Sequence, residues 1–406
     1  MGKSKPAADH DHSYIMVVAS FVMMMVIWGT FSTFGVFFEP LIREHGWTRA
    51  LTSGAASLNN LTFGIACIFT ASLCERVGHR VVVSCTALLL GAGYYGMARM
   101  TSPWELYLLY GVVIALGMSA YIPILTIVAR RFEKGRGMMT GIVLSGMGLG
   151  TFLMPLVAVR LIARFEWRAA YTIIGLASFL TMILAAQFVG RRQSGAGIPS
   201  GNGRAASDGP ESSVHGLSFS EASRTGRFWL TCLLYFAFLY SLLTVLVHIV
   251  IHATGMGIPA GAAARILAIV GGLCIVGMNA MGSGADRIGN RSAMAASFAL
   301  MAIGFLWLLF AREPWMLNLF AVIFGFAYGG MQTLFSPIVA ELFGLRSHGT
   351  ILSTAALAGT VGAVVGPLLA GYLYDVSGSY KVAFLLCALL CIASVVTSPL
   401  LKPSRH

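Results

Sequence analysis

Two ten-residue segments, about half a chain apart, are versions of each other. Residues 71–80 read ASLCERVGHR, and residues 282–291 read GSGADRIGNR. Each follows a long apolar segment and places an acidic residue, an arginine and a glycine in a short basic turn. Glycine lets the backbone reverse direction at once because it has no Cβ. A turn that is repeated in this way predicts a chain of two similar halves.

The composition places these halves in a membrane. The chain is 57% hydrophobic and only 10% charged, whereas soluble domains carry about 25% charged residues. A helix that crosses a bilayer needs about 20 apolar residues. We therefore expect an all-α membrane protein in which two six-helix bundles hold twelve transmembrane helices. These lie at residues 14–39, 50–73, 81–98, 103–129, 137–160, 168–190, 228–252, 262–284, 293–311, 314–340, 349–374 and 382–401.

The polar segments define the expected domain organisation. The longest of them is rich in Gly, Ser and Arg and has little to bury, which is typical of a flexible linker between the bundles. We expect an N-terminal tail at 1–13, a six-helix bundle at 14–190, a linker at 191–227, a second bundle at 228–401 and a C-terminal tail at 402–406.

The net charge of +12 is distributed in a way that predicts orientation. If both termini are cytoplasmic, two thirds of the 27 Lys and Arg residues fall in cytoplasmic segments, as the positive-inside rule requires. We therefore expect cytoplasmic termini and no nucleic-acid partner. The seven cysteines lie in or at the ends of apolar spans, where they behave as small hydrophobes. No metal site and no cofactor are expected, and the chain contains no set of residues that predicts an enzyme.

The repeated turn resembles the loop between the second and third helices, and its repeat between the eighth and ninth, in the major facilitator superfamily. The residues that carry the resemblance are Glu75, Arg76, Gly78 and Arg80 in the first copy and Asp286, Arg287, Gly289 and Arg291 in the second. It implies a major facilitator fold and transport by alternating access to a site near the middle of the membrane.

Two longer strings narrow the resemblance. Residues 34–50 read FGVFFEPLIREHGWTRA, and residues 131–150 read RFEKGRGMMTGIVLSGMGLG. The first resembles bacterial members of the monocarboxylate transporter and oxalate/formate exchanger branch, and the second resembles the helix 5 signature of the monocarboxylate family. In the first string, Pro40 is expected to end the first span. In the second, Gly141, Gly146 and Gly150 are expected to let helices approach closely.

The resemblance implies two charged residues that this chain lacks. The family pattern places an arginine that pairs with the substrate carboxylate four residues before Gly282, where this chain has Met278. Four residues earlier, where the mammalian transporters carry an aspartate for proton coupling, it has Cys274. All fifteen acidic residues lie in tails, loops or the ends of spans. The alignment shifts here, or the substrate is bound by other groups, or the chain is an altered version.

Neutral polar side chains in the spans are the remaining candidates for substrate binding. Hydroxyl and amide groups can hold a carboxylate where the dielectric constant is low, and each can instead serve as a helix–helix hydrogen bond. Tyr121, Asn279 and Tyr328 are the strongest candidates. The wider set adds Gln332, Met278 and Tyr374. The candidates for proton coupling are His248 and His252, since histidine titrates near pH 6.5.

Together these features predict a multi-pass transporter of the bacterial inner membrane, working as a monomer in the lipid bilayer. The predicted substrate is a small monocarboxylate of the lactate or pyruvate type, moved with a proton. An exchanger or exporter of another small organic solute is the alternative within transport. A membrane sensor or scaffold that transports nothing is the alternative from another class.

Overall fold

The structure is a computed structural model that describes residues 7–131, 136–189, 216–344 and 346–401. These residues are helical apart from connecting turns and one isolated bridge between Gly216 and Gly344. The N-terminal helices are α1 (Ala7–His45), α2 (Arg49–Val77), α3 (His79–Met97), α4 (Pro103–Leu106), π-helix η1 (Tyr107–Ile114), α5 (Ala115–Met118), α6 (Tyr121–Arg131) and α7 (Arg136–Val189). The C-terminal helices are α8 (Phe219–Ser223), α9 (Gly226–Gly255), α10 (Ala260–Ile288), α11 (Asn290–Phe310), α12 (Pro314–Phe343), α13 (His348–Ser377), α14 (Lys381–Thr397) and the short η2 (Ser398–Leu400).

Within the described ranges, eleven helical segments are long and apolar enough to cross a membrane. The segment in α7 covers two of the twelve expected spans. They are separated by an interruption of the helix at Glu166, whose φ is 66° and ψ is 165°. An L-residue rarely adopts this conformation, and it reverses the chain between the two spans. The predicted all-α membrane class is confirmed.

The two repeated turns have almost the same backbone. Gly78 joins α2 to α3 with φ 90° and ψ 150°, and Gly289 joins α10 to α11 with φ 85° and ψ 147°. In each turn the glycine N–H donates to the carbonyl four residues before it, at 3.0 Å and 2.9 Å. Only glycine adopts such angles without strain, which explains the glycine in each copy.

Charged residues of the turns have different partners. Arg80 donates to the side-chain amide oxygen of Gln187 on α7. Arg291 donates from Nε to Glu341 on α12 at 3.1 Å, and Arg76 and Arg287 are exposed. The side chains of Glu75 and Asp286 lie outside the part of the chain that the structure describes.

The expected end of the first span is wrong. Helix α1 continues through Pro40 to His45, and it begins at Ala7, inside the predicted tail. Proline removes only one backbone donor, and the turns around it are held by side chains of the same helix. Arg43 donates to Glu39 at 2.8 Å, and the His45 ring bonds the carbonyl of Leu41 at 3.2 Å.

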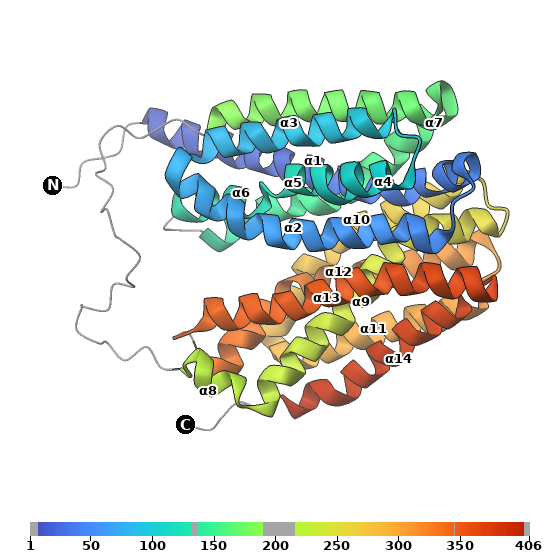
Figure 1. Cartoon of the computed structure of the whole chain (residues 1–406). Helices are drawn as coiled ribbons and strands as arrows, with labels where there is room; N and C mark the ends of the chain where they lie inside the picture. The colour runs from blue at the N-terminus through green and yellow to red at the C-terminus, as the bar shows by residue number, and fades with distance from the viewer. Residues whose placement is uncertain (1–6, 132–135, 190–215, 345, 402–406) are drawn as a thin grey trace.

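The N-terminal and C-terminal helices form two groups that lie side by side (Figure 1). Within the groups, α1 packs along α7, α9 along α13 and α10 along α12. Between the groups, α2 packs along α13 and α7 along α10. We call the end where α1 begins and α14 ends the terminal face, and the end where α1 ends and α2 begins the far face.

Glycines permit the close approach of helices that the sequence predicts, at two of the three expected positions. A Cβ on Gly146 would lie 2.5 Å from the carbonyl oxygen of Phe21, and one on Gly150 would lie 2.2 Å from that of Met25. Both contacts join α7 to α1. A Cβ on Gly141, in contrast, would meet nothing within 4 Å, so this glycine is not required for packing.

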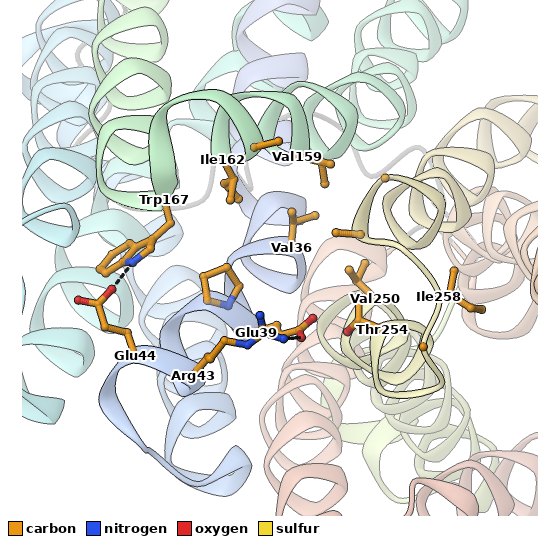
Figure 2. A pocket seen from close by; sticks show the side chains of 15 residues that line it. Val36, Glu39, Arg43, Glu44, Val159, Ile162, Trp167, Val250, Thr254 and Ile258 are labelled. Carbon is orange, nitrogen blue, oxygen red and sulfur yellow. Dashed lines mark hydrogen bonds and ion pairs between the residues drawn. The ribbon is translucent and has the colours of Figure 1, made fainter.

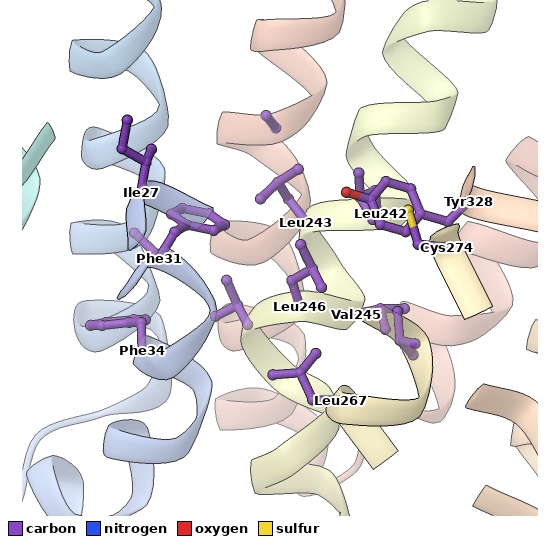
Figure 3. Close-up of a cluster of buried hydrophobic side chains, with 14 of the residues drawn as sticks. Ile27, Phe31, Phe34, Leu242, Leu243, Val245, Leu246, Leu267, Cys274 and Tyr328 are labelled. Atoms are coloured by element: carbon purple, nitrogen blue, oxygen red, sulfur yellow. The ribbon is translucent and has the colours of Figure 1, made fainter. Parts of the chain in front are cut away.

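The buried core crosses from one helix group to the other. Phe31 and Phe34 of α1 face the same apolar cluster as Leu243 and Leu246 of α9 (Figure 3). In the second half of α1, Gly35 approaches α9 so closely that a Cβ would lie 2.8 Å from the carbonyl oxygen of Leu246. The two groups are therefore in direct apolar contact at this level.

Part of the predicted linker is ordered. Residues 190–215 lie outside the described residues, but α8 follows them, and its capping box is formed by Ser218 and Glu221. Hydrogen bonds from the Ser218 backbone N–H and hydroxyl hold the pKa of Glu221 below its usual value. Leu217 donates to the carbonyl of Phe343 at 2.8 Å, which fixes α8 to the end of α12.

Candidate functional site

A cavity of about 460 Å³ lies between the two helix groups, toward the terminal face. We call it the terminal-side cavity. Both groups contribute to its walls, and Asn279 on one wall is exposed. Its described lining residues are Tyr121 from α6, Gly141, Ile142, Leu144, Ser145 and Met147 from α7, Ile275, Met278 and Asn279 from α10, and Gln332 and Thr333 from α12.

Four of the six predicted substrate-binding residues are brought together there. They are Tyr121, Met278, Asn279 and Gln332. The side chains come from three helices of both groups, although Tyr121 is more than 150 positions from the others in sequence. None of the described lining residues carries a formal charge.

The amide groups at the cavity are only partly used by the protein. Asn279 donates from Nδ2 to the carbonyl of Ile275 at 2.8 Å. Gln332 donates from Nε2 to the Tyr328 hydroxyl at 3.4 Å. Among the described residues, each amide therefore keeps a second N–H donor and a carbonyl oxygen acceptor for another partner.

Tyr328, the fifth predicted residue, lies behind the cavity wall. It is 2% exposed, and its hydroxyl accepts the hydrogen bond from Gln332. Its ring lies beside Cys274 (Figure 3). A Cβ on Gly329 would lie 2.0 Å from the carbonyl oxygen of Cys274, so α10 and α12 are in direct backbone contact here. The position at which the family pattern implies an aspartate is thus a packing position in this chain.

One aromatic residue at this site was missed by the sequence reasoning. Trp28 of α1 packs edge-on to Tyr121, with ring centroids 6.2 Å apart, and also to Phe31 and Phe63. Its indole N–H is buried and has no hydrogen-bond partner in the described structure. A buried donor without a partner costs about 1–3 kcal/mol. A tryptophan in the middle of a span, away from the membrane interface where this residue is enriched, was the available signal.

Tyr374, the sixth predicted residue, is on the far face instead. The guanidinium carbon of Arg49 lies 3.5 Å from the centre of its ring. Arg49 also donates from Nη1 to the Tyr380 hydroxyl at 2.8 Å. The backbone N–H groups of Arg49 and Ala50 donate to the Asp375 carboxylate at 3.0 Å and 2.7 Å. Helix α2 is therefore tied to α13 and α14 at this end.

The two histidines are part of the same far-face region. His248 is fully buried. Its Nε2 lies 2.9 Å from the carbonyl oxygen of Pro367 and its Nδ1 lies 3.0 Å from the Tyr380 hydroxyl. Because the carbonyl can only accept, Nε2 is the protonated nitrogen and donates to it. His252 stacks edge-on against Tyr380 and Phe384, and its buried Nε2 has no partner among the described residues.

A second and larger cavity opens on the far face (Figure 2). It measures about 750 Å³ and lies between α1, α7, α9 and the start of α10. Val36, Val159, Ile162, Val250 and Ile258 form apolar walls. At its rim Glu44 accepts hydrogen bonds from Trp167 and Arg168, which hold the interruption of α7 at Glu166 against the end of α1. None of the predicted substrate-binding residues lines this cavity.

Within the described ranges, no group of three or more His, Cys, Asp or Glu side chains could hold a metal ion. The seven cysteines are all free thiols.

Comparison with known proteins agrees with this architecture. The family model for the Major Facilitator Superfamily matches residues 18–293 and 280–406. The chain is 29% identical to "Monocarboxylate transporter 12" of Mus musculus over 362 residues, which cover 80% of this chain and 73% of that protein. It is 24% identical to "Monocarboxylate transporter 13" of Rattus norvegicus over 401 residues, which cover 95% of this chain and 88% of that protein.

A solved structure has the same fold. It is the crystal structure of a bacterial homologue of the human lysosomal transporter Spinster, in an inward-facing and occupied conformation. The TM-score is 0.75 at 13% sequence identity, and the match covers 98% of this chain and 97% of that one.

Proposed function

This chain belongs to the Major Facilitator Superfamily, and from that premise we propose that it moves small monocarboxylates of the lactate or pyruvate type together with a proton. Membership makes it a multi-pass membrane transporter and not an enzyme. The proposed mechanism is alternating access, in which the two helix groups rock around a central site.

The observation that carries the proposal is the terminal-side cavity between the helix groups. Its volume of about 460 Å³ exceeds the needs of a three-carbon acid. Asn279 and Gln332 present free donors and acceptors to it, and Tyr121 stands on the opposite wall. The named relatives are monocarboxylate transporters, which supports a carboxylic acid as the substrate class.

The conformation supports alternating access. On the far face Arg49 and Asp375 join the groups, and further along α2 the Ser57 hydroxyl donates to the carbonyl of Val364 at 2.6 Å. The cavity lies on the other side of these contacts. The proposed cycle breaks these contacts, widens the opening that the far face already has at the larger cavity, and closes the terminal-side cavity.

The remaining details are part of the proposal. We place the protein in a bacterial inner membrane, in the monocarboxylate and oxalate/formate exchanger branch, as a monomer with cytoplasmic termini. The bundles are proposed at 14–190 and 228–401, joined by a cytoplasmic linker at 191–227. The distribution of Lys and Arg supports this orientation. A cysteine at Ser207 should resist labelling from outside intact cells, whereas one at Ala260, exposed on the far face, should react. The reverse pattern would overturn the orientation.

Uptake of labelled lactate into proteoliposomes tests the function. An inwardly directed proton gradient should accelerate initial uptake over that measured at equal pH, and liposomes without protein should show the passive background. Folded protein that gives no uptake above this background, with or without the gradient, would refute the proposed function.

A further inference from the structure

We propose that the terminal-side cavity binds its substrate as the neutral, protonated carboxylic acid, so that the substrate itself carries the proton. This inference rests on the proposed function and specifies which form of the substrate the same site accepts. It is carried by the mixture of hydrogen-bond donors and acceptors at the cavity and by the neutrality of the described walls.

The first step concerns charge. The described lining residues include no lysine, arginine or histidine that could pair with an anion, and Met278 stands where the family pattern implies an arginine. A thioether is only a weak acceptor. When the cavity closes and water leaves, an ionised carboxylate would be buried with no counter-charge among the described lining residues. Groups in this situation become neutral instead of remaining ionised.

The second step concerns hydrogen-bond direction. A carboxylate only accepts, whereas a protonated acid has one O–H donor and a carbonyl acceptor. The cavity offers free acceptors as well as donors, namely the amide oxygens of Asn279 and Gln332. A carboxylate would face these oxygens without a proton between them. A neutral acid can donate its O–H to an amide oxygen and accept from the N–H of the same amide.

The third step is the proton balance. The acid enters with its O–H bond intact, crosses with it, and loses the proton to water after release on the other side. One proton then moves with each substrate molecule, and no side chain has to titrate. This coupling needs no acidic residue at the cavity, in agreement with the neutral lining described here.

The cost of this mode is a low concentration of the transported form. For an acid with a pKa near 4, only about one molecule in a thousand is neutral at pH 7. Uptake must therefore fall about tenfold for each unit of pH above the pKa of the acid.

The test compares two labelled monocarboxylates of similar size whose pKa values differ by about one unit. Initial uptake into proteoliposomes is measured over a range of pH at equal total concentration, and the rate in protein-free liposomes is subtracted at each pH. The profile of the weaker acid should lie about one unit higher. Two profiles that coincide in pH would show that a group of the protein titrates, and would overturn the proposal.

A second measurement uses lactamide, an uncharged analogue of lactic acid with an amide in place of the acid group. It should inhibit lactate uptake. As the pH rises, less lactic acid is present to compete with lactamide, so the half-inhibitory concentration of lactamide should fall. If lactate is taken up but lactamide does not inhibit its uptake at any pH, the cavity requires the anion and the proposal is wrong. If lactate is not taken up at any pH, the proposed function fails, and this inference fails with it.

Discussion

The guanidinium of Arg49, at the start of α2, lies 3.5 Å from the centre of the Tyr374 ring on α13. The same guanidinium donates to the Tyr380 hydroxyl, which in turn contacts the buried His248 of α9. A single cation thus connects one helix group to three helices of the other. The two contacts that Arg49 makes with Tyr374 and Tyr380 join the helix groups and must be rearranged if the far face opens, whereas the contact between Tyr380 and His248 lies within the C-terminal group.

Replacing Arg49 by alanine should favour opening of the far face. The lost hydrogen bond and cation–π contact are worth about 1–2 kcal/mol, which corresponds to roughly a tenfold shift of the equilibrium. A cysteine introduced at the buried Ser53, with Cys85 replaced by serine, should react faster with a membrane-impermeant maleimide. Arg43→Ala is the matched control, because Arg43 is 79% exposed and pairs with Glu39 of its own helix. Equal rates in both variants would remove Arg49 from the closure of the far face.

The contact between α7 and α10 should tolerate no Cβ at Gly271. A Cβ there would lie 2.6 Å from the backbone N of Phe152 and 2.7 Å from the carbonyl oxygen of Gly148. Because backbone cannot move aside, Gly271→Ala should cost about 1–3 kcal/mol, measured as a lower midpoint of thermal unfolding in detergent. The neighbouring Gly272→Ala should be close to wild type, since its Cβ would meet the Phe152 ring at 3.4 Å. The packing is misjudged if the two variants unfold at the same temperature.

The repeated turns should respond alike to the loss of their glycines. Gly78→Ala and Gly289→Ala each place a side chain at a φ near +90°, at a cost of about 1–3 kcal/mol. Both should reduce the yield of folded protein in size-exclusion profiles. Gly284→Ala, at a helical position with nothing within 4 Å of the added Cβ, should not. A variant at one turn that is as stable as wild type would show that the two turns are not equivalent.

The histidines separate two sources of the coupled proton. The sequence offers His248 and His252 as candidates for proton coupling, whereas a substrate that carries its own proton does not need them. If the substrate is the carrier, the His248→Gln, His252→Gln double variant should keep the pH dependence of uptake while its maximal rate changes, since His248 supports the far-face contacts. Loss of the pH dependence in this variant would show that the histidines, and not the substrate, carry the coupled proton.

The fold could be predicted from sequence because two strong signals agree. Long apolar segments set the helices, and the paired glycine turns at Gly78 and Gly289 set the repeat. The end of α1 was misplaced because local side chains keep the helix intact beyond Pro40. The rule that proline ends a helix does not include this compensation.

The candidate site was harder to predict than the fold. The span assignment led to the choice of Tyr121 and Asn279, because their helices line the centre of this architecture. Both residues line the terminal-side cavity. Tyr374 was a weaker choice, because it ends its expected span at 349–374 and therefore lies at the far face instead of the centre. Trp28 was missed because its mid-span position, although unusual for tryptophan, does not show whether the indole N–H is bonded in the fold or free for a ligand.

The most direct test of the proposed site compares two asparagines that have the same local bond. Asn279 on α10 donates to the carbonyl of Ile275, and Asn60 on α2 donates to that of Ala56, each at 2.8 Å and each four residues back along the helix. Only Asn279 is among the described residues that line the terminal-side cavity.

The decisive measurement is the initial rate of lactate uptake by Asn279→Leu and Asn60→Leu in proteoliposomes that contain equal amounts of folded protein. Loss of a substrate hydrogen bond of about 1–1.5 kcal/mol should lower the Asn279→Leu rate roughly tenfold at low substrate concentration. The Asn60→Leu rate should stay near that of the wild type. Equal rates for the two variants, or a loss confined to Asn60→Leu, would contradict transport through this cavity.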